Sequence, residues 1–145
     1  MSCTIFFDMD GTIADLYGVN NWLEYLINSD EYPYKNAKPL INLNSLARIL
    51  NNLQKRGYRI GIISCLSKGS NNKYDEKITA AKIKWLNKHL ASVKFDEINI
   101  ISYETPKETF NNNNDILFDD EERNRNNWTG TAFDVNNIIE ILKTL

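Results

Sequence analysis

Two aspartates, Asp8 and Asp10, stand two positions apart where an apolar run ends, in the stretch FFDMDGTIAD (residues 6–15). Like charges this close repel each other, and each carboxylate loses hydration if it enters the protein interior. A bound cation is the usual compensation, and oxygen ligands suit a hard cation such as Mg²⁺. Gly11 follows at once and permits the unusual backbone turn that such a strand end needs. The sequence therefore predicts a magnesium site at the end of the first strand.

Further polar groups that could act on phosphate stand near the ends of later apolar runs. They are Ser64, Lys107, Asp119 and Asp120. Because the carboxyl ends of parallel strands meet at one edge of a sheet, we expect these groups to converge with the first aspartate pair. Four carboxylates, a hydroxyl and an ammonium would suit a divalent cation and a phosphoryl group, whose negative charge the cation and the lysine would neutralise.

Apolar runs alternate with helical repeats along the chain, and they predict the elements that position these groups. β-prone apolar runs predict strands over residues 3–7, 58–64, 97–102, 115–118 and 131–133. Helical spacing of apolar residues predicts helices over 20–28, from 43 up to Gly57, over 75–90 and over 135–145. Strands that alternate with helices predict a parallel sheet with right-handed crossovers. We expect an α/β, Rossmann-like, three-layer fold with a mainly parallel central sheet.

Size and composition are those of one soluble globular domain, residues 1–145, with 42% hydrophobic and 25% charged residues. The net charge of −2 provides no electrostatic reason for tight binding to nucleic acid or to a membrane. No apolar run approaches the roughly 18 residues that a membrane span needs. Cys3 and Cys65 suit neither a disulfide framework nor a zinc pattern. With no signal peptide in the sequence, we expect a cytoplasmic protein.

In their order and spacing, these motifs resemble those of the haloacid dehalogenase (HAD) superfamily of phosphotransferases. The chain shows D-x-D-G-T after the first strand, an apolar run ending in Ser after the second, then a lysine, and an apolar strand ending in D-D. The resemblance extends from Asp8 to Asp120, most of the chain. It implies a HAD-like core and a Mg²⁺-dependent phosphomonoesterase that acts through an aspartyl phosphate.

The resemblance also implies a role for each residue. Asp8 would attack phosphorus, and Asp10 would protonate the leaving oxygen and then deprotonate the attacking water. Ser64 would hydrogen-bond a phosphoryl oxygen, helped by the backbone N–H of Cys65. Lys107 would offset the negative charge on Asp8 and on the phosphoryl group. The implied Mg²⁺ ligands are Asp8, the backbone carbonyl of Asp10, Asp119 and, directly or through water, Asp120.

Three stretches resemble the 5′(3′)-deoxyribonucleotidase group in shortened form: AAKIKWLNKHL (80–90), EINIIS (97–102) and ILFDDEERNRNNW (116–128). This resemblance implies a nucleoside monophosphate as substrate and a phosphate contact from Lys82, three positions before Trp85. We expect Lys82 near the start of its helix, where the helix dipole favours anions. The alternative interpretation is an exposed lysine on an amphipathic helix. Ser64 stands where the group usually has threonine.

Only residues 13–42 are free to form a substrate-selecting insertion after the first strand, so we expect a minimal cap and an open site. That cap is much smaller than the one in which the nucleotidase group builds most of its nucleoside pocket. Trp22 and Tyr25 lie in this segment, and a ligand role for them is left open. Trp85 and Trp128 are interpreted as packing residues.

The motifs are also compatible with three other functions. A polynucleotide 3′-phosphatase would need such an open site, but the sequence lacks a basic stripe beyond Lys82, Lys84 and Lys88 and has no phosphate-binding P-loop motif. A general small-metabolite phosphatase is a second alternative. A phospho-aspartate receiver domain also uses clustered aspartates, Mg²⁺ and a lysine, but an acidic pair after the lysine is the HAD order. The oligomeric state is not predicted.

Overall fold

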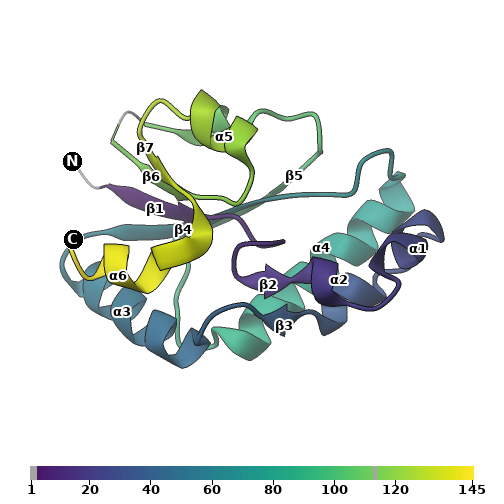
Figure 1. Cartoon of the computed structure of the whole chain (residues 1–145), viewed down its shortest axis with the longest axis horizontal. Helices are drawn as coiled ribbons and strands as arrows, with labels where there is room; N and C mark the ends of the chain where they lie inside the picture. The colour runs from purple at the N-terminus through teal and green to yellow at the C-terminus, as the bar shows by residue number, and fades with distance from the viewer. Residues whose placement is uncertain (1–2, 113) are drawn as a thin grey trace.

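A five-stranded parallel sheet lies at the centre of the computed structural model, which describes residues 3–112 and 114–145 (Figure 1). Its order is β5-β4-β1-β6-β7, and all four neighbouring pairs are parallel. The strands are β1 (Thr4–Phe7), β4 (Arg59–Cys65), β5 (Glu97–Ile101), β6 (Ile116–Phe118) and β7 (Thr131–Phe133). The chain winds outward from β1 in both directions, which creates a switch point between β1 and β6 where such sheets bind ligands. The predicted strands and Rossmann-like α/β class are confirmed.

The predicted helices are also present, with shifted ends. They are α1 (Trp22–Ile27), α3 (Leu43–Lys55), α4 (Asn72–His89) and a 3₁₀ turn, η3 (Val135–Asn137), that leads into α6 (Ile138–Leu142). The helix α4 begins earlier than expected because the side chain of Asn71 accepts a hydrogen bond from the Tyr74 backbone N–H at 2.9 Å, a typical N-cap. Gly57 follows α3 with a φ of 100°, as expected of a residue that ends a helix.

Both faces of the sheet are buried, because successive residues of each strand point to opposite sides. Ile5 and Phe7 of β1 join the larger core, which α3, α4 and α6 cover. Phe6 belongs to the smaller core on the other face, together with Trp128, which follows α5 (Glu122–Asn127). Trp85 and Trp128 are 2% and 5% exposed, and each indole N–H donates to a backbone carbonyl. Their interpretation as packing residues is therefore confirmed.

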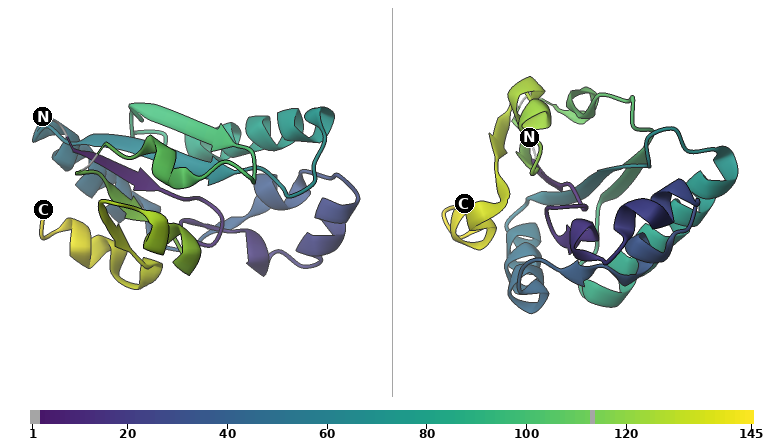
Figure 2. Two further views of the ribbon diagram at one scale, coloured as in Figure 1. Left: turned by 90° about the horizontal axis from the view of Figure 1, so that it is seen from above. Right: turned by 45° about the vertical axis from the view of Figure 1, so that its right-hand side comes forward.

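Residues 13–42, the insertion segment, lie beyond the carboxyl ends of the strands (Figures 1 and 2). Besides α1, the segment contains β2 (Ala14–Asp15), η1 (Leu16–Gly18), α2 (Tyr32–Asn36) and β3 (Lys38–Pro39), and β2 pairs with β3 in antiparallel fashion. Leu16 and Tyr34 anchor the segment, because they pack in a third core against Tyr74 and Ile78 of α4. The segment is thus held over the edge of the sheet where we expect chemistry, and its role as a small cap stays a prediction.

None of the helices within residues 3–112 and 114–145 combines the length and apolar character that a membrane crossing requires.

Candidate active site

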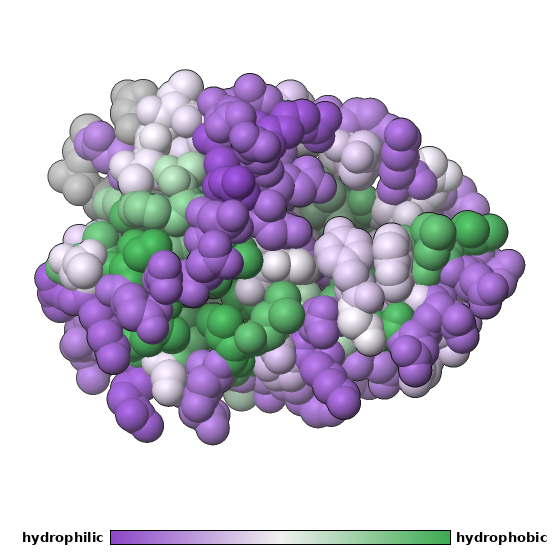
Figure 3. Space-filling view, in the orientation of Figure 1, coloured by the Kyte–Doolittle hydropathy of each residue, from purple (hydrophilic) through white to green (hydrophobic). Residues whose placement is uncertain are grey.

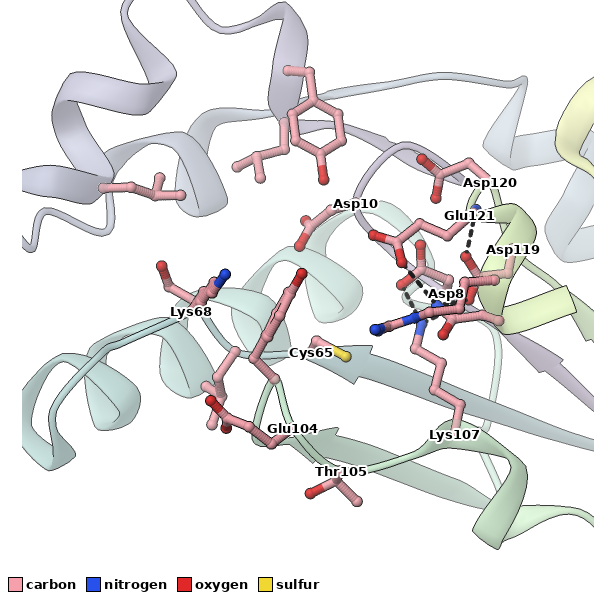
Figure 4. A pocket seen from close by; sticks show the side chains of 18 of the residues that line it. Asp8, Asp10, Cys65, Lys68, Glu104, Thr105, Lys107, Asp119, Asp120 and Glu121 are labelled. Atoms are coloured by element: carbon pink, nitrogen blue, oxygen red, sulfur yellow. Dashed lines mark hydrogen bonds and ion pairs between the residues drawn. The ribbon is translucent and has the colours of Figure 1, made fainter. Parts of the chain in front are cut away.

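The ends of β1 and β6 bring two aspartates and a lysine into one buried cluster (Figure 4). Asp8 follows β1, and its backbone N–H donates to the Phe118 carbonyl of β6 at 3.0 Å, so Asp119 lies beside it. Lys107 begins the 3₁₀ helix η2 (Lys107–Phe110) and donates from Nζ to Asp8 Oδ1 at 2.9 Å and to Asp119 Oδ2 at 2.8 Å. Burial lowers the pKa of Lys107, but the two carboxylates outweigh it and hold the pKa above its usual value. Its ammonium therefore stays charged.

The turn after β1 holds this cluster through Gly11 and Thr12. Thr12 Oγ1 donates to Asp8 Oδ2 at 3.0 Å and lies 3.4 Å from Asp120 Oδ1. Gly11 has a φ of 79°, and a Cβ atom at this position would overlap the Asp120 carboxylate. Glycine is needed here for its backbone conformation and for the close approach of Asp120. The motif D-x-D-G-T was recognised in the sequence, but the contacts of Thr12 were not predicted.

Carboxylate oxygens of Asp8, Asp119 and Asp120 lie within 4.8 Å of one another. Burial, with repulsion from Asp8, raises the pKa of Asp119 to about 6 and that of Asp120 to about 8. A divalent cation would relieve this repulsion, and an all-oxygen donor set fits Mg²⁺. These three residues therefore fit the predicted metal site. The contribution of the Asp10 backbone carbonyl stays a prediction.

The helix α5 and the residue before it support Asp119 from the other side. Asn124 Nδ2 donates to Asp119 Oδ2 at 3.1 Å, and the Glu121 backbone N–H donates to Oδ1 at 2.9 Å. Arg125 donates to the Asp119 backbone carbonyl at 3.0 Å. Sequence reasoning did not identify Asn124 or Arg125. The sequence allowed two interpretations of the acidic run at residues 119–122, metal ligands or the start of a helix. The structure shows both features, because Asp119 and Asp120 belong to the carboxylate cluster and α5 begins at Glu122.

Asp10, Ser64 and Cys65 meet around Lys82, on the side of the pocket near β4. Lys82 Nζ donates to Ser64 Oγ at 2.6 Å, to the Cys65 carbonyl at 2.7 Å and to Asp10 Oδ2 at 3.0 Å. Burial raises the pKa of Asp10, and repulsion from Asp8 adds to this effect, whereas Lys82 opposes it. A raised pKa suits a group that must donate a proton near neutral pH.

The expectation for the position of Lys82 is wrong in one respect. Lys82 lies in the middle of α4 rather than near its start, so the dipole argument for anion binding does not apply. The alternative of an exposed surface lysine is wrong too, because only 1% of Lys82 is exposed. Lys82 follows Ile78 by four residues and precedes Trp85 by three, so it occupies the apolar stripe of the helix. That position in the sequence was the signal of burial.

A pocket of about 730 Å³ opens above these residues (Figure 4). We call the charged residues at its base the acidic floor: Asp8, Asp10, Asp119, Asp120 and Lys107. One side of the pocket, which we call the apolar wall, comes from the insertion segment: Leu16, Tyr17, Trp22, Leu23, Leu26 and Ile27. Cys65 also lines the pocket, whereas Ser64 is fully buried. The predicted catalytic and metal residues are therefore brought together at one cavity.

No protein-family model matches the chain, and no curated protein matches it. Among solved structures, the chain is similar to the crystal structure of D,D-heptose 1,7-bisphosphate phosphatase from Burkholderia thailandensis. The TM-score is 0.55 at 14% sequence identity, over 89% of this chain and 75% of the other. At this identity the likeness concerns the fold, and it is consistent with the HAD-like core that the motifs implied. It does not extend to the nucleotidase group, which stays a prediction.

Proposed function

We propose that this chain is a Mg²⁺-dependent phosphomonoesterase that acts through an aspartyl phosphate, with nucleoside monophosphates as its preferred substrates. The observation that carries the proposal is the acidic floor, where three carboxylates and a charged lysine surround one position at the switch point of the sheet. The fold likeness to a solved sugar-bisphosphate phosphatase supports the general activity. A cytoplasmic location is part of the proposal.

In the first step, a carboxylate oxygen of Asp8 forms a bond to phosphorus while the bond from phosphorus to the leaving oxygen breaks. Asp10 gives its proton to that oxygen, so the product leaves as a neutral alcohol. Lys107, 2.9 Å from Asp8 Oδ1, offsets negative charge that accumulates as the phosphoryl group approaches. The backbone N–H of Cys65, which lines the pocket, is proposed to hydrogen-bond a phosphoryl oxygen, whereas Ser64, buried against Lys82, is assigned to support of this strand end.

In the second step, water attacks phosphorus and Asp10, now ionised, accepts its proton. The bond between Asp8 and phosphorus then breaks, which releases inorganic phosphate and restores both carboxyl groups. Asp8, Asp119 and Asp120 would hold Mg²⁺, which supplies charge neutralisation for the phosphoryl oxygens. Asn124 and the Glu121 backbone N–H keep Asp119 in place throughout.

The apolar wall supports a substrate that carries a flat, poorly hydrated group beside its phosphate. Figure 3 shows an apolar patch over α1, where Leu23 and Ile27 are 54% and 72% exposed. Tyr17 and Trp22 pack edge to face with ring centroids 4.9 Å apart, which provides an aromatic surface. A nucleobase could cover such a surface, because stacking and apolar contact do not require matched hydrogen bonds. A sugar phosphate would leave most of it uncovered.

A substrate screen tests the proposal. The purified chain is assayed for phosphate release with Mg²⁺ or with EDTA on 5′- and 3′-nucleoside monophosphates, 3′-phosphorylated oligonucleotides and sugar phosphates. We expect Mg²⁺-dependent turnover with the highest kcat/KM for nucleoside monophosphates. A preference for 3′-phosphorylated oligonucleotides would indicate a polynucleotide 3′-phosphatase instead, and a preference for sugar phosphates would indicate a small-metabolite phosphatase. Stable phosphorylation of Asp8 by a small phosphodonor without turnover of any monoester would indicate a receiver-like domain.

A further inference from the structure

Lys82 is a charged residue that is buried between α4 and the sheet, and its polar contacts are all internal to the protein. Its ammonium carries three N–H donors, and these meet three acceptors: Ser64 Oγ, the Cys65 carbonyl and Asp10 Oδ2, all within 3.0 Å. The Tyr34 ring packs beside it, with Nζ 5.1 Å from the ring centroid. Every donor of this lysine is therefore used within the protein.

The three acceptors come from two segments on which the proposed chemistry depends. Ser64 and Cys65 end β4, whereas Asp10 belongs to the turn after β1. Lys82 joins these segments from α4, 72 residues along the chain from Asp10 and 17 from Cys65. The Lys82 contact fixes Oδ2 of Asp10 and, within the described residues, leaves Oδ1 as the oxygen that can exchange a proton at the pocket.

Lys82 itself does not reach the substrate space. It is 1% exposed and does not line the pocket, whereas Asp10 and Cys65 do. A direct contact with a phosphate would require the ammonium to leave at least one of its three partners. Such a move would leave a buried acceptor unsatisfied, which is costly in a protein interior.

We propose that Lys82 is a positioning residue, which holds Asp10 and the end of β4 in reactive geometry from beneath the pocket and does not contact the substrate. The inference rests on the proposed phosphatase function, because Asp10 and the Cys65 end of β4 act on a phosphate monoester there. Its role differs from that of Lys107, which contacts the nucleophile and lines the pocket. Lys82 thus supports proton transfer by Asp10, whereas Lys107 offsets the negative charge of Asp8.

Steady-state kinetics of Lys82→Met separate this role from a phosphate contact. With a nucleoside monophosphate, we expect kcat to fall about 10-fold to 100-fold, because misplaced acid–base groups lose part of their usual contribution, while KM changes less than about twofold. Lys84→Met, on the exposed side of the same helix, is the matched control and should leave both constants unchanged. A rise in KM with kcat retained would overturn the proposal in favour of direct phosphate binding.

A second measurement, a burst assay with p-nitrophenyl phosphate, distinguishes the loss of acid–base positioning from a general loss of folded structure. The p-nitrophenolate ion leaves without needing a proton, whereas the attack of water on the aspartyl phosphate still needs Asp10 as base. Lys82→Met should therefore release a burst of p-nitrophenolate approaching one per chain, followed by a slow steady rate. If burst amplitude and steady rate fall together, the variant has only lost folded protein and the proposal is wrong.

A comparison of the double variant Asp10→Asn/Lys82→Met with Asp10→Asn keeps the proposal testable even if Lys82→Met alone does not fold. The double variant removes both partners of the buried ion pair, so it leaves no lone buried charge. If Lys82 acts through Asp10, the double variant should have a kcat within about threefold of Asp10→Asn alone. A further loss of more than about threefold would show that Lys82 acts mainly through groups other than Asp10, and would overturn its assignment to proton transfer. Absence of turnover by the unmodified chain on every monoester would reject the proposed function instead.

Discussion

The acidic floor and the apolar wall face the same pocket but are built in opposite ways. Floor residues are buried or partly buried and are held through ion pairs and hydrogen bonds of about 3 Å, as Lys107 is with Asp8 and Asp119. Wall residues such as Leu23 and Ile27 are more than half exposed and depend on a short helix of six residues. A rigid floor suits chemistry that must keep its geometry, whereas an exposed wall suits contact with a variable leaving group. Substitutions in the floor should therefore alter kcat, and substitutions in the wall should alter KM.

The largest effect is expected for Asp8→Asn. An amide is a poor nucleophile and a weaker cation ligand than a carboxylate, so kcat should fall by about 10³-fold or more on every substrate. Phosphate release with saturating Mg²⁺ measures the loss. Glu140→Gln, which removes one exposed charge on α6, is the control and should keep the unmodified rate. If Asp8→Asn kept its activity, the proposed catalytic role of the acidic floor would be wrong.

Lys107→Met should have the next largest effect, because it leaves two buried carboxylates without their cation. We expect kcat to fall by about 10²-fold and the melting temperature in EDTA to fall below that of Lys84→Met. Mg²⁺ should restore part of the lost melting temperature, since it can replace the missing positive charge. An unchanged melting temperature in EDTA would mean that the pair contributes nothing to stability.

The floor could be predicted from the sequence because its signals are local and lie at strand ends. An apolar run that stops at Asp8 or at Asp119 marks both the strand and the edge of the sheet. Parallel pairing then brings these ends together without any knowledge of side-chain contacts. The position of Lys107 followed from its place just before β6. Thr12 and Asn124 were missed because their roles depend on side-chain geometry within a turn and on one helix face.

The wall could not be predicted to the same degree. The strands β2 and β3 have two residues each and α2 has five, lengths at which periodicity is not informative. Tyr34 is buried against α4, and such a contact between distant segments leaves no pattern in the sequence. The burial of Lys82 could have been recognised, since a lysine in the apolar stripe of a helix needs acceptors in the interior.

The dependence on pH should distinguish the acidic floor from the apolar wall. Without metal, the folded-state pKa values of about 6 for Asp119 and about 8 for Asp120 exceed those of unfolded aspartates. The folded chain then binds more protons, so its free energy of unfolding should decrease as pH rises through this range. Mg²⁺ competes with those protons, so its stabilising effect should increase over the same range.

Thermal unfolding in EDTA and in Mg²⁺ at pH 6 and pH 8 measures both effects. We expect the melting temperature without metal to be lower at pH 8, and the gain on adding Mg²⁺ to be larger there. Asp120→Asn should weaken the pH dependence of that gain, because it removes the carboxyl with the higher pKa. A gain from Mg²⁺ that is equal at both pH values would contradict proton competition at the floor.

The smallest effect is expected at the wall, for Leu23→Ser. Covering the exposed part of a leucine is worth about 1 kcal/mol, so KM for a nucleoside monophosphate should rise about fivefold while kcat stays constant. Leu40→Ser is the matched control, because Leu40 is a similarly exposed leucine of the insertion segment that does not line the pocket. KM for a sugar phosphate should not change, since it has no base to place on the wall. An equal rise for both substrates would mean that Leu23 supports the pocket as a whole, and base recognition would then have to lie elsewhere.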